Sequence, residues 1–419
     1  MADRVVILGG GFAGLAVAGS LKRSPVEILI VDRQNHHLFQ PLLYQVATGG
    51  LAPEDIAVPI RHVFRAQKNV KVLQAEVQQI DRRAKRVQTS VGQVPYDVLV
   101  VATGSEYNYF GKDDWKKEAL SLKAIGDATR MRDQVLRAFE AAEFESDSAR
   151  RRQLLTFVIV GAGPTGVELA GALAELSHKA IRDEFRNFDP ASTEILLVEA
   201  GSRILAPFSE ELSRKAERAL HRLGVKVITG TAVKALDGSG VLLGERKIEA
   251  ATVFWAAGVR ATSIATGLGA ETDSFGRVKV SSDLSLAMDP SVFVIGDAAC
   301  VLGADGKPLP AVAPVAKQQG QHVGRVIQSR LAGMLAPKFQ YVDKGNLATV
   351  GRRYAVAEVL GLHLAGLIAW WIWVVVHIFY LIDFKNRILV MTQWIWYYVT
   401  FHRGRRVISD VRRRSEKSS

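Results

Sequence analysis

Two stretches of the chain repeat one pattern of hydrophobic and polar positions. In each, a run of apolar residues leads into a glycine-rich turn, at residues 5–14 and again at residues 157–166. A helical stretch follows, and then a second apolar run that ends in an acid, Asp32 in the first stretch and Glu199 in the second. Continuous apolar runs bounded by glycine are typical of strands covered on both faces. The pattern therefore predicts two strand–helix–strand units in one α/β chain.

Three later apolar runs end in tight turns and predict where each unit closes. Residues 97–104 close the first unit, residues 253–259 close the second, and residues 292–299 form a further strand. A helix over about 314–330 should follow. We expect this last segment to return to the first domain, so that the second unit is inserted into the first. The expected boundaries are 1–115 and 276–345 for the first domain, 116–275 for the inserted domain and 346–419 for a C-terminal region.

The C-terminal region combines apolar runs with aromatic and basic residues. Residues 364–382 carry no charge, apart from the titratable His377, and are long enough to cross a membrane, and a second apolar run covers residues 388–401. A buried core helix, a membrane span and a membrane-interface segment are the three interpretations of this region. Its tryptophans and tyrosines, followed by arginines, favour the interface. These aromatic residues are Trp370, Trp371, Trp373, Trp394, Trp396, Tyr397 and Tyr398.

The composition excludes several classes of protein. With 48% hydrophobic and 23% charged residues the chain is not disordered, and 419 residues suffice for two or three domains. Cys300 is the only cysteine, which excludes an internal disulfide and a CxxC redox pair and fits a reducing compartment. There is no His/Cys cluster, so we expect no metal site. The first residues run straight into a strand, which leaves no room for a signal peptide.

Positive charge is concentrated at the C-terminal end. The net charge is +12, and residues 383–419 hold nine lysines and arginines against three acidic residues. Near an anionic membrane each exposed cation adds on the order of 1 kcal/mol to binding. Nucleic acid would attract the same tail, but no folded module that reads nucleic acid accompanies it. We therefore expect an anionic lipid surface as the partner.

The glycines of the first turn have distinct tasks in a dinucleotide site. Gly9 allows the tight turn, Gly11 lets the backbone approach a pyrophosphate, and Gly14 lets the helix pack closely on the strand. The helix N-terminus attracts the phosphates, and Asp32 would hold the ribose hydroxyls. The alternative is a glycine turn without a ligand, which the agreement of strand, glycines, helix and acid disfavours.

The second turn repeats this arrangement with Gly161, Gly163 and Gly166, and with Glu199 at the ribose. A carboxylate at that place repels a 2′-phosphate, so we expect NADH rather than NADPH. Arg203 lies close enough in the sequence to leave the strictness of this preference open. Two dinucleotides in one chain indicate that electrons pass between them.

The ordered motifs resemble those of flavoproteins with two dinucleotide-binding domains. They are GGGFAG from Gly9, the turn at 102–104, GAGPTGVELAG from Gly161 and VFVIGDAA from Val292. Three more segments are similar to type II NADH:quinone oxidoreductases, the single-subunit respiratory enzymes that do not pump protons. These segments are 38–49, which resembles the loop beside their isoalloxazine, then 313–320, and the aromatic stretch 377–408.

The resemblance implies a fold, a reaction and a location. The fold is α/β, with two Rossmann-like dinucleotide-binding domains, the NADH domain inserted in the FAD domain, and C-terminal helices that lie in the plane of one leaflet. The reaction passes a hydride from NADH to FAD and two electrons on to a membrane quinone. The protein would be peripheral on the cytoplasmic side of the cell membrane, and a homodimer joined through the C-terminal regions is expected.

The motifs and the resemblance together name the site residues. The FAD site comprises Gly9, Gly11, Phe12, Ala13, Gly14, Asp32, Arg33, Gln40, Val77, Ala102, Thr103, Gly104, Gly296 and Asp297. The NADH site comprises Gly161, Gly163, Pro164, Thr165, Gly166, Glu168, Glu199, Ala257 and Gly258. The quinone site comprises Pro314, Val315, Lys317, Gln318 and His377. The residues expected to carry the reaction are Glu168, Gln318 and Gln45, with His377 and Lys317 as weaker candidates for the proton path.

Two acids have both a structural and a functional interpretation. Glu168 stands two residues after the last glycine, in the first turn of the second helix, where an acid is stabilising. In the functional interpretation it faces the nicotinamide and the flavin edge and orients the carboxamide or handles protons. Asp297 would cap the following helix or bind a ribityl hydroxyl or phosphate, and the cap is favoured.

One departure and two alternatives limit the functional prediction. The quinone-site pattern of the family is AQxAxQ, and here Ala313, Ala316 and Gln318 match it whereas Pro314 replaces the first glutamine. A sulfide:quinone oxidoreductase needs cysteines beside the flavin, which the single Cys300 does not supply. A flavoprotein reductase with another acceptor and a membrane-docked redox sensor without turnover stay open.

Overall fold

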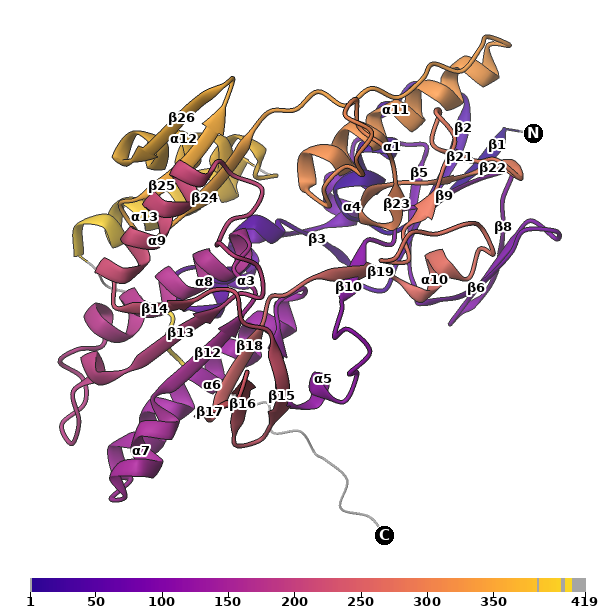
Figure 1. The fold of residues 1–419 in the computed structure, drawn as a ribbon. Helices are drawn as coiled ribbons and strands as arrows, with labels where there is room; N and C mark the ends of the chain where they lie inside the picture. Colours follow the sequence, from indigo (N-terminus) through magenta and orange to yellow (C-terminus); the bar gives the residue numbers. More distant parts are fainter. Residues whose placement is uncertain (1, 383, 401–403, 409–419) are drawn as a thin grey trace. The chain divides into compact units, whose positions relative to one another are not determined.

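The computed structural model describes residues 2–382, 384–400 and 404–408, and Figure 1 shows its helices and strands. The chain divides into two compact units, each assembled from three stretches. The first unit consists of Met1–Leu38, Ala57–Asn108 and Val259–Lys344, and the second of Phe39–Ile56, Tyr109–Gly258 and Gly345–Ser419. The basic residues Arg403, Arg412, Arg413, Arg414 and Lys417, which contribute to the expected lipid surface, lie outside the described residues.

The first unit is built on a six-stranded sheet in the order β21-β22-β9-β1-β2-β5. Its strands are β1 (Asp3–Leu8), β2 (Val26–Asp32), β5 (Val70–Gln74), β9 (Val98–Val101), β21 (Ser285–Leu286) and β22 (Asp289–Val294). All neighbours pair in parallel except β21 and β22. The chain turns from β1 to β2 on one side and pairs β1 with β9 on the other. The carboxyl end of β1 is therefore a topological switch point, where such sheets bind ligands.

Smaller elements cover this sheet. A three-stranded sheet of β6 (Val77–Asp81), β7 (Arg86–Thr89) and β8 (Gly92–Pro95) contributes Val87 and Val94 to the core formed with β1, β9 and β22. The other elements are α1 (Phe12–Ser20), β3 (His36–Leu38), β4 (Ala57–Pro59), α4 (Ile60–Val63), β10 (Ser105–Tyr107), β19 (Val259–Ala261), α10 (Ser263–Thr266), β20 (Val278–Lys279), η4 (Gly296–Ala298), β23 (Ala299–Cys300) and α11 (Ala313–Leu331).

Helices α1 and α11 pack closely because glycine occupies the contact points. A Cβ on Gly320 would lie 2.2 Å from the carbonyl oxygen of Ala13, and one on Gly324 would lie 2.4 Å from the Cβ of Ser20. The helix predicted over 314–330 is thus confirmed as α11, which covers the helix of the first glycine turn.

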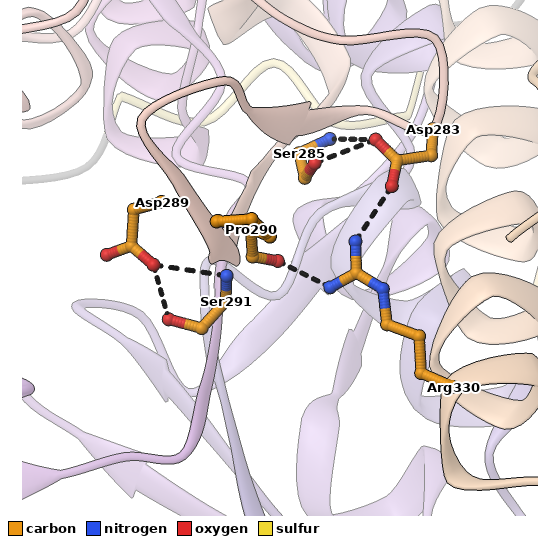
Figure 2. A network of polar contacts seen from close by, with 6 residues as sticks. All are labelled: Asp283, Ser285, Asp289, Pro290, Ser291 and Arg330. Atoms are coloured by element: carbon orange, nitrogen blue, oxygen red, sulfur yellow. Dashed lines mark hydrogen bonds and ion pairs between the residues drawn. The ribbon is translucent and has the colours of Figure 1, made fainter. Parts of the chain in front are cut away.

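The far end of α11 is held by Arg330, as Figure 2 shows. Its guanidinium donates to Oδ2 of Asp283 at 2.7 Å and to the carbonyl oxygen of Pro290, and it lies 4.8 Å from the ring centre of Phe293. The other oxygen of Asp283 accepts hydrogen bonds from the backbone N–H and the hydroxyl of Ser285. One arginine therefore ties α11 to both sides of the β21–β22 hairpin.

The second unit has a five-stranded parallel sheet in the order β11-β18-β12-β13-β14. Its strands are β11 (Leu120–Ser121), β12 (Thr156–Val160), β13 (Glu194–Val198), β14 (Val225–Ile228) and β18 (Thr252–Trp255). The carboxyl end of β12, between β13 and β18, is the second switch point. The other elements up to residue 258 are η1 (Gln40–Leu42), α2 (Leu43–Ala47), α3 (Pro53–Ile56), α5 (Trp115–Glu118), α6 (Ile125–Phe144), α7 (Ser148–Leu154), α8 (Pro164–Glu175), η2 (Leu176–Ala180), η3 (Pro190–Ser192), α9 (Glu210–Arg222), β15 (Val233–Asp237), β16 (Gly240–Leu243) and β17 (Arg246–Glu249).

The C-terminal part of this unit is a three-stranded sheet followed by two helices. The strands are β24 (Asn346–Thr349), β25 (Ala355–Val359) and β26 (Leu362–Gly366), and the helices are α12 (Leu367–Tyr380) and α13 (Phe384–Thr400). The uncharged run at 364–382 does not form one helix, because its first residues pair with β25 instead. In the described part of the chain, no helix has both the length and the hydropathy needed to cross a bilayer.

The tryptophans of this part divide into two groups. Trp373 is 2% exposed and Trp370 is 8% exposed, so both pack inside the unit. Trp371 and Trp396 are 53% and 64% exposed, and Trp394 is half-buried. The expectation that all of these aromatic residues form an interface is therefore wrong for Trp370 and Trp373. The side chains of Tyr397 and Tyr398 lie outside the described residues.

Candidate active site

The first glycine turn has the shape that a dinucleotide phosphate requires. Gly9 has a φ of +110°, and a Cβ there would lie 2.2 Å from the carbonyl oxygen of Ala102, at the end of β9. A Cβ on Gly14 would lie 2.0 Å from the carbonyl oxygen of Gly9. Gly11, in contrast, has open space beside it, so the start of α1 can be approached by a phosphate. These residues fit the FAD that the sequence predicts.

The acid after β2 clamps this turn. Oδ2 of Asp32 accepts the N–H of Gly10 at 2.6 Å, and Oδ1 accepts the N–H of Gln34 at 2.7 Å. The neighbouring Arg33 is exposed, and Val77 is a half-buried residue of β6 that packs on the core. The carboxylate thus stands at the turn where the sequence predicts a ribose contact.

A buried histidine completes the turn, and the sequence interpretation missed it. His37 is 1% exposed and its ring meets Phe12 edge-on, with 4.9 Å between the ring centres. Its Nδ1 lies 3.0 Å from the carbonyl oxygen of Gly10, which can only accept, so Nδ1 carries the hydrogen. Burial lowers the pKa of His37 to about 4, and the neutral ring leaves Nε2 as a buried acceptor without a partner in the structure. An unpaired polar atom beside a glycine turn is the kind of group that a ligand satisfies.

The Gly296-Asp297 segment joins the same turn. A Cβ on Gly296 would lie 3.5 Å from the Cβ of Ala13, and its N–H donates to Oε1 of Gln319 at 2.6 Å. Asp297 accepts the hydroxyl of Ser105 at 2.7 Å. The expectation that Asp297 caps the following helix is wrong, because Asp297 lies inside the short helix η4 and α11 begins only after Val312. Gln319, 1% exposed, is a second residue that the sequence interpretation missed.

The second glycine turn reproduces the first. Gly161 has a φ of +97°, and a Cβ there would lie 2.6 Å from the backbone nitrogen of Ala257. A Cβ on Gly166 would lie 1.9 Å from the carbonyl oxygen of Gly161, whereas Gly163 is open. Pro164 and Thr165 are exposed at the start of α8, and Gly258 has a φ of +67°. The turn therefore fits a second nucleotide, the predicted NADH.

Glu199 holds this turn as Asp32 holds the first. One carboxylate oxygen accepts the N–H of Ala162 at 2.7 Å and the other accepts the N–H of Gly201 at 2.8 Å. The guanidinium of Arg203 donates to the carbonyl oxygens of Ala206 and Phe208, both at 2.6 Å. Since the Arg203 guanidinium is hydrogen-bonded to carbonyl oxygens of its own loop, the Glu199 carboxylate is the charged group beside the turn.

Glu168 lies in the second turn of α8, which begins at Pro164. The expectation that it stabilises the first turn as a helix N-terminal acid is therefore wrong. Its side chain is 8% exposed, and one oxygen lies 3.4 Å from the N–H of Thr349 on β24. Burial raises the pKa of Glu168 to about 8, against smaller opposing effects of Thr349 and the Trp373 indole. The carboxyl is consequently protonated at neutral pH.

A hydrogen-bonded chain runs from α13 to this carboxyl. The indole N–H of Trp394 donates to Oε1 of Gln45 at 2.8 Å, and Nε2 of Gln45 donates to the hydroxyl of Tyr44 at 3.0 Å. The Tyr44 hydroxyl lies 3.1 Å from that of Thr349. An indole can only donate, which fixes the orientation of the Gln45 amide and makes the Tyr44 hydroxyl an acceptor of its N–H. The chain therefore connects Trp394 with Thr349, whose backbone N–H faces Glu168.

His377 lies on α12 in the same unit. Its Nδ1 is 2.7 Å from the carbonyl oxygen of Trp373 and therefore donates, and its ring stacks on Trp373 with 4.0 Å between the ring centres. Phe39 meets the other side of the ring, at 6.2 Å. Burial lowers the pKa of His377 to about 4, so the ring is neutral and its Nε2 is an acceptor.

The remaining predicted residues divide between the units. Pro314, Val315, Lys317 and Gln318 lie on α11 in the first unit, and both ends of the Gln318 amide bind the backbone of Val342. Gln40 belongs to the second unit, is exposed, and donates to the carbonyl oxygen of Lys123 at 3.4 Å. The predicted quinone residues thus include one group on α11 and His377 on α12. Thr103 forms a hydroxyl contact with Thr262 at 2.7 Å, and Gly104 has a φ of +70°.

Comparison with known proteins agrees with this geometry. The pyridine nucleotide-disulphide oxidoreductase family model matches residues 3–320, and the NDH2 C-terminal domain model matches residues 344–403. A type II NADH:quinone oxidoreductase of Mycobacterium tuberculosis is 42% identical over 97% of this chain and 90% of its own length. One from Staphylococcus haemolyticus is 32% identical over 87% of this chain and 91% of its own length. The structure of NDH2 from Plasmodium falciparum in complex with NADH superposes with a TM-score of 0.87, at 21% identity, over 97% of this chain and 99% of that one.

Proposed function

Because the chain belongs to the family of type II NADH:quinone oxidoreductases, we propose which of its residues carry that reaction. The protein is a membrane-associated flavoenzyme that oxidises NADH and reduces a quinone. When bound, FAD would supply the acceptor for the hydride of NADH and the carrier of two electrons to the quinone. The observation that supports the residue assignment is the pair of glycine turns, each clamped by an acid and each with one glycine left open.

The first turn holds FAD. The open backbone at Gly11 and the start of α1 take the pyrophosphate, and Asp32 takes the ribose. Around them we place Phe12, Ala13, Arg33, Gln40, Val77, Ala102, Thr103, Gly104, Gly296 and Asp297. His37 and Gln319 are added to this group because both are buried at the turn, and because His37 keeps an acceptor nitrogen free for the ligand.

The second turn holds NADH. The pyrophosphate lies over Gly163 and the exposed start of α8, and the ribose binds Glu199. A carboxylate already clamped by two backbone N–H groups cannot move aside for a 2′-phosphate, so NADH is preferred to NADPH. Pro164, Thr165, Ala257 and Gly258 complete the contacts.

Glu168 acts as a proton-holding group. Its carboxyl is neutral at pH 7 because it is buried, and it lies on the helix whose N-terminus we assign to NADH. The chain from Trp394 through Gln45 and Tyr44 to Thr349 orients the backbone that binds this carboxyl. A protonated acid in such a place donates a hydrogen bond, or a proton, without a change in net charge.

For the quinone we keep two groups of candidate residues, one on α11 in the first unit and one on α12 in the second. On α11 the residues are Pro314, Val315, Lys317 and Gln318, and on α12 the residue is His377. The support is the 313–320 segment with its two matching alanines, and the neutral His377 whose Nε2 accepts. Proline at 314 removes one amide contact that the family pattern supplies, so Gln318 has to leave Val342 if it is to bind the quinone.

The protein docks on the membrane as a peripheral protein from the cytoplasmic side. The exposed apolar side chains of α12 and α13 support this proposal, among them Ile368, Trp371, Val375, Phe379 and Trp396. Arg405 and Arg406 contribute less than the sequence indicates, because they pair with Asp55 and Glu184 of the same unit. Two copies would associate through this C-terminal part, which sedimentation in detergent would test.

The decisive experiment follows flavin absorbance without oxygen while NADH and then a short-chain quinone are added. Bleaching by NADH and recovery with quinone are expected. Bleaching without recovery would contradict the quinone assignment, and no bleaching would contradict the NADH site. Glu168→Gln should slow one half-reaction on the order of 100-fold. Glu175→Gln is the matched control, since Glu175 is buried on the same helix and its carboxylate accepts the backbone N–H of Arg352.

A further inference from the structure

Two adjoining pockets open on the second unit, away from both glycine turns in the sequence. The larger has a volume of about 350 Å³ and is lined by Lys215, Arg218, Arg222, Tyr354 and Ala365. The smaller has a volume of about 260 Å³ and shares Arg222 and Tyr354 with the first. Its further lining includes the cationic residues Lys179, Arg352 and Arg353 and one acid, Glu175.

The cations of the larger pocket come from one face of α9. Lys215, Arg218 and Arg222 follow one another at intervals of three and four residues, so their side chains project to the same side of the helix. Leu212, Ser213, Ala216, Ala219 and Leu220 are the buried residues of α9, whereas Arg218 and Arg222 are exposed. The sequence places three cations in a row beside the β25–β26 hairpin, which supplies Ala365 as the pocket wall.

Two of these three cations have no ion pair within the described part of the chain. Lys215 pairs with Glu211 at 2.6 Å, but neither Arg218 nor Arg222 has a carboxylate within salt-bridge distance. Arg222 instead lies 5.5 Å from the ring centre of Tyr354, which holds its guanidinium at the boundary between the two pockets. Glu175, the one acid of the lining, is bonded to the backbone N–H of Arg352 at 2.7 Å. The pair of pockets therefore attracts an anion.

The surroundings identify the kind of anion. Ala365 is followed directly by Gly366 and α12, whose Ile368, Trp371 and Phe379 are 67%, 53% and 66% exposed. At the other end of the same strand, Leu360 is 91% exposed and Leu362 is 60% exposed. A soluble phosphate would make no contact with these apolar side chains. A membrane phospholipid carries both a phosphate, for the cations, and acyl chains, for the apolar side chains.

We propose that the α9 pocket, lined by Lys215, Arg218, Arg222 and Tyr354, binds the phosphate head group of an anionic membrane phospholipid. The guanidinium of Arg218 and that of Arg222 bind the phosphate oxygens, and the acyl chains lie along the exposed side of α12. This inference rests on the proposed docking of α12 on the membrane. It adds a specific lipid contact on α9, separate in the sequence from the basic C-terminal residues.

The test measures how the full chain with FAD binds vesicles of phosphatidylcholine with and without phosphatidylglycerol. The double variant Arg218→Gln, Arg222→Gln is compared with Arg214→Gln, a neighbouring arginine of α9 that does not line the pockets and pairs with Glu210. We expect the double variant to lose on the order of tenfold in affinity for the anionic vesicles, and Arg214→Gln to change it less than about twofold. Binding to pure phosphatidylcholine, and NADH oxidation with a water-soluble quinone, should be unchanged in all three proteins.

Each other outcome contradicts one specific claim. Equal losses in the double variant and in Arg214→Gln would mean general surface attraction and would overturn the pocket. Equal binding of the wild-type protein to both kinds of vesicle would overturn the head-group site while leaving membrane docking intact. If the wild-type protein binds neither, docking by α12 is wrong. Inorganic pyrophosphate, added as a competitor, should not displace a short-chain monomeric phosphatidylglycerol at equal concentration, and displacement would mean that the ligand is a soluble phosphate.

Discussion

The two glycine turns, at Gly9–Gly14 and Gly161–Gly166, have nearly the same geometry but different surroundings. In each, a Cβ on the third glycine would lie about 2 Å from the carbonyl oxygen of the first, at 2.0 Å for Gly14 and 1.9 Å for Gly166. In each, an acid at the end of the next strand accepts a backbone N–H of the turn, at 2.6 Å for Asp32 and 2.7 Å for Glu199. In both turns, close backbone contact at the third glycine and one acid side chain hold the same geometry.

The two turns differ one helical turn later. The position two residues beyond the third glycine is Ala16 in the first unit and Glu168 in the second. Ala16 is covered by α11, where a Cβ on Gly320 would lie 2.8 Å from the Cβ of Ala16. Glu168 is covered by β24, where its carboxyl lies 3.4 Å from the backbone N–H of Thr349. Under the assignment that we propose, the helix N-terminus binds the nucleotide in both units, and only the second unit carries an acid in the next turn to hold a proton.

The largest expected effect on cofactor binding comes from adding a Cβ at the glycines where α1 and α8 touch the glycine turns. Gly14→Ala and Gly166→Ala each force a carbonyl and a helix apart, at a cost of ~3 kcal/mol or more. Gly14→Ala should be isolated without FAD, whereas Gly166→Ala should keep FAD and bind NADH roughly 100-fold more weakly. Flavin content and NADH titration measure the two effects. Gly19→Ala, which has open space beside it, should leave both unchanged. Loss of FAD in Gly166→Ala would mean that the two turns are not independent.

The second effect is a change in how stability depends on pH. The pKa of Glu168 is about 8 in the native state and 4.5 in the unfolded state, so between these values only the native state holds the proton. Wild-type stability should therefore fall as the pH rises from 4.5 to 8, by at most ~1.4 kcal/mol per pH unit. Glu168→Gln cannot ionise and lacks this loss. Urea unfolding at several pH values should give curves that diverge in that window, and parallel curves would contradict a protonated Glu168.

The third effect concerns the acids that clamp the turns. Glu199→Gln keeps an oxygen for the N–H of Ala162 but removes the charge that faces a 2′-phosphate. The ratio of kcat/KM for NADH to that for NADPH should fall about tenfold, equivalent to ~1.4 kcal/mol. Asp32→Asn is the counterpart in the other turn and should change FAD retention but not this ratio. A ratio altered equally by both variants would show that nucleotide preference is not set at Glu199.

The smallest effect tests the link between α13 and α2, the helix that contains Gln45. Trp394→Phe keeps an aromatic ring at this position but removes the indole N–H that donates to Oε1 of Gln45. Loss of one such hydrogen bond should lower the free energy of unfolding by about 0.5–1.5 kcal/mol and speed amide exchange in α2. Trp396→Phe, at a side chain that is 64% exposed, should cost less than about 0.5 kcal/mol. Equal costs in the two variants would remove the special role of Trp394.

Local patterns predict the parts of this molecule that depend on local geometry. The apolar runs that end at Gly9 and Gly161 predict buried parallel strands. The glycines themselves predict the turns, because a position where a neighbouring carbonyl excludes a Cβ requires glycine in the sequence. The helix at 314–330 was also predictable, since its composition and its place after a strand agree with α11.

The buried polar chain was not predictable from such patterns. Tyr44 and Thr349 are 305 residues apart in the sequence. The periodicity of either segment does not predict the hydrogen bond between their hydroxyls. The error about the tryptophans has the same cause. Trp373 is buried against residues distant in the sequence, among them Trp394, whereas Trp371, two residues before it, is exposed. Asp297 was misplaced because a short helix, η4, intervenes before α11.

The order of strands in the first sheet has a consequence for synthesis on the ribosome. β9 ends at Val101, and its neighbour β22, which pairs Val292 with Leu99, is translated about 190 residues later. At typical elongation rates of about 5–20 residues per second, one edge of β9 stays without its partner for about 10–40 s. An open edge of fully apolar strand is prone to pair with other chains. Fast translation of the 102–291 segment, or a chaperone that covers the open edge of β9, should therefore reduce mispairing during synthesis.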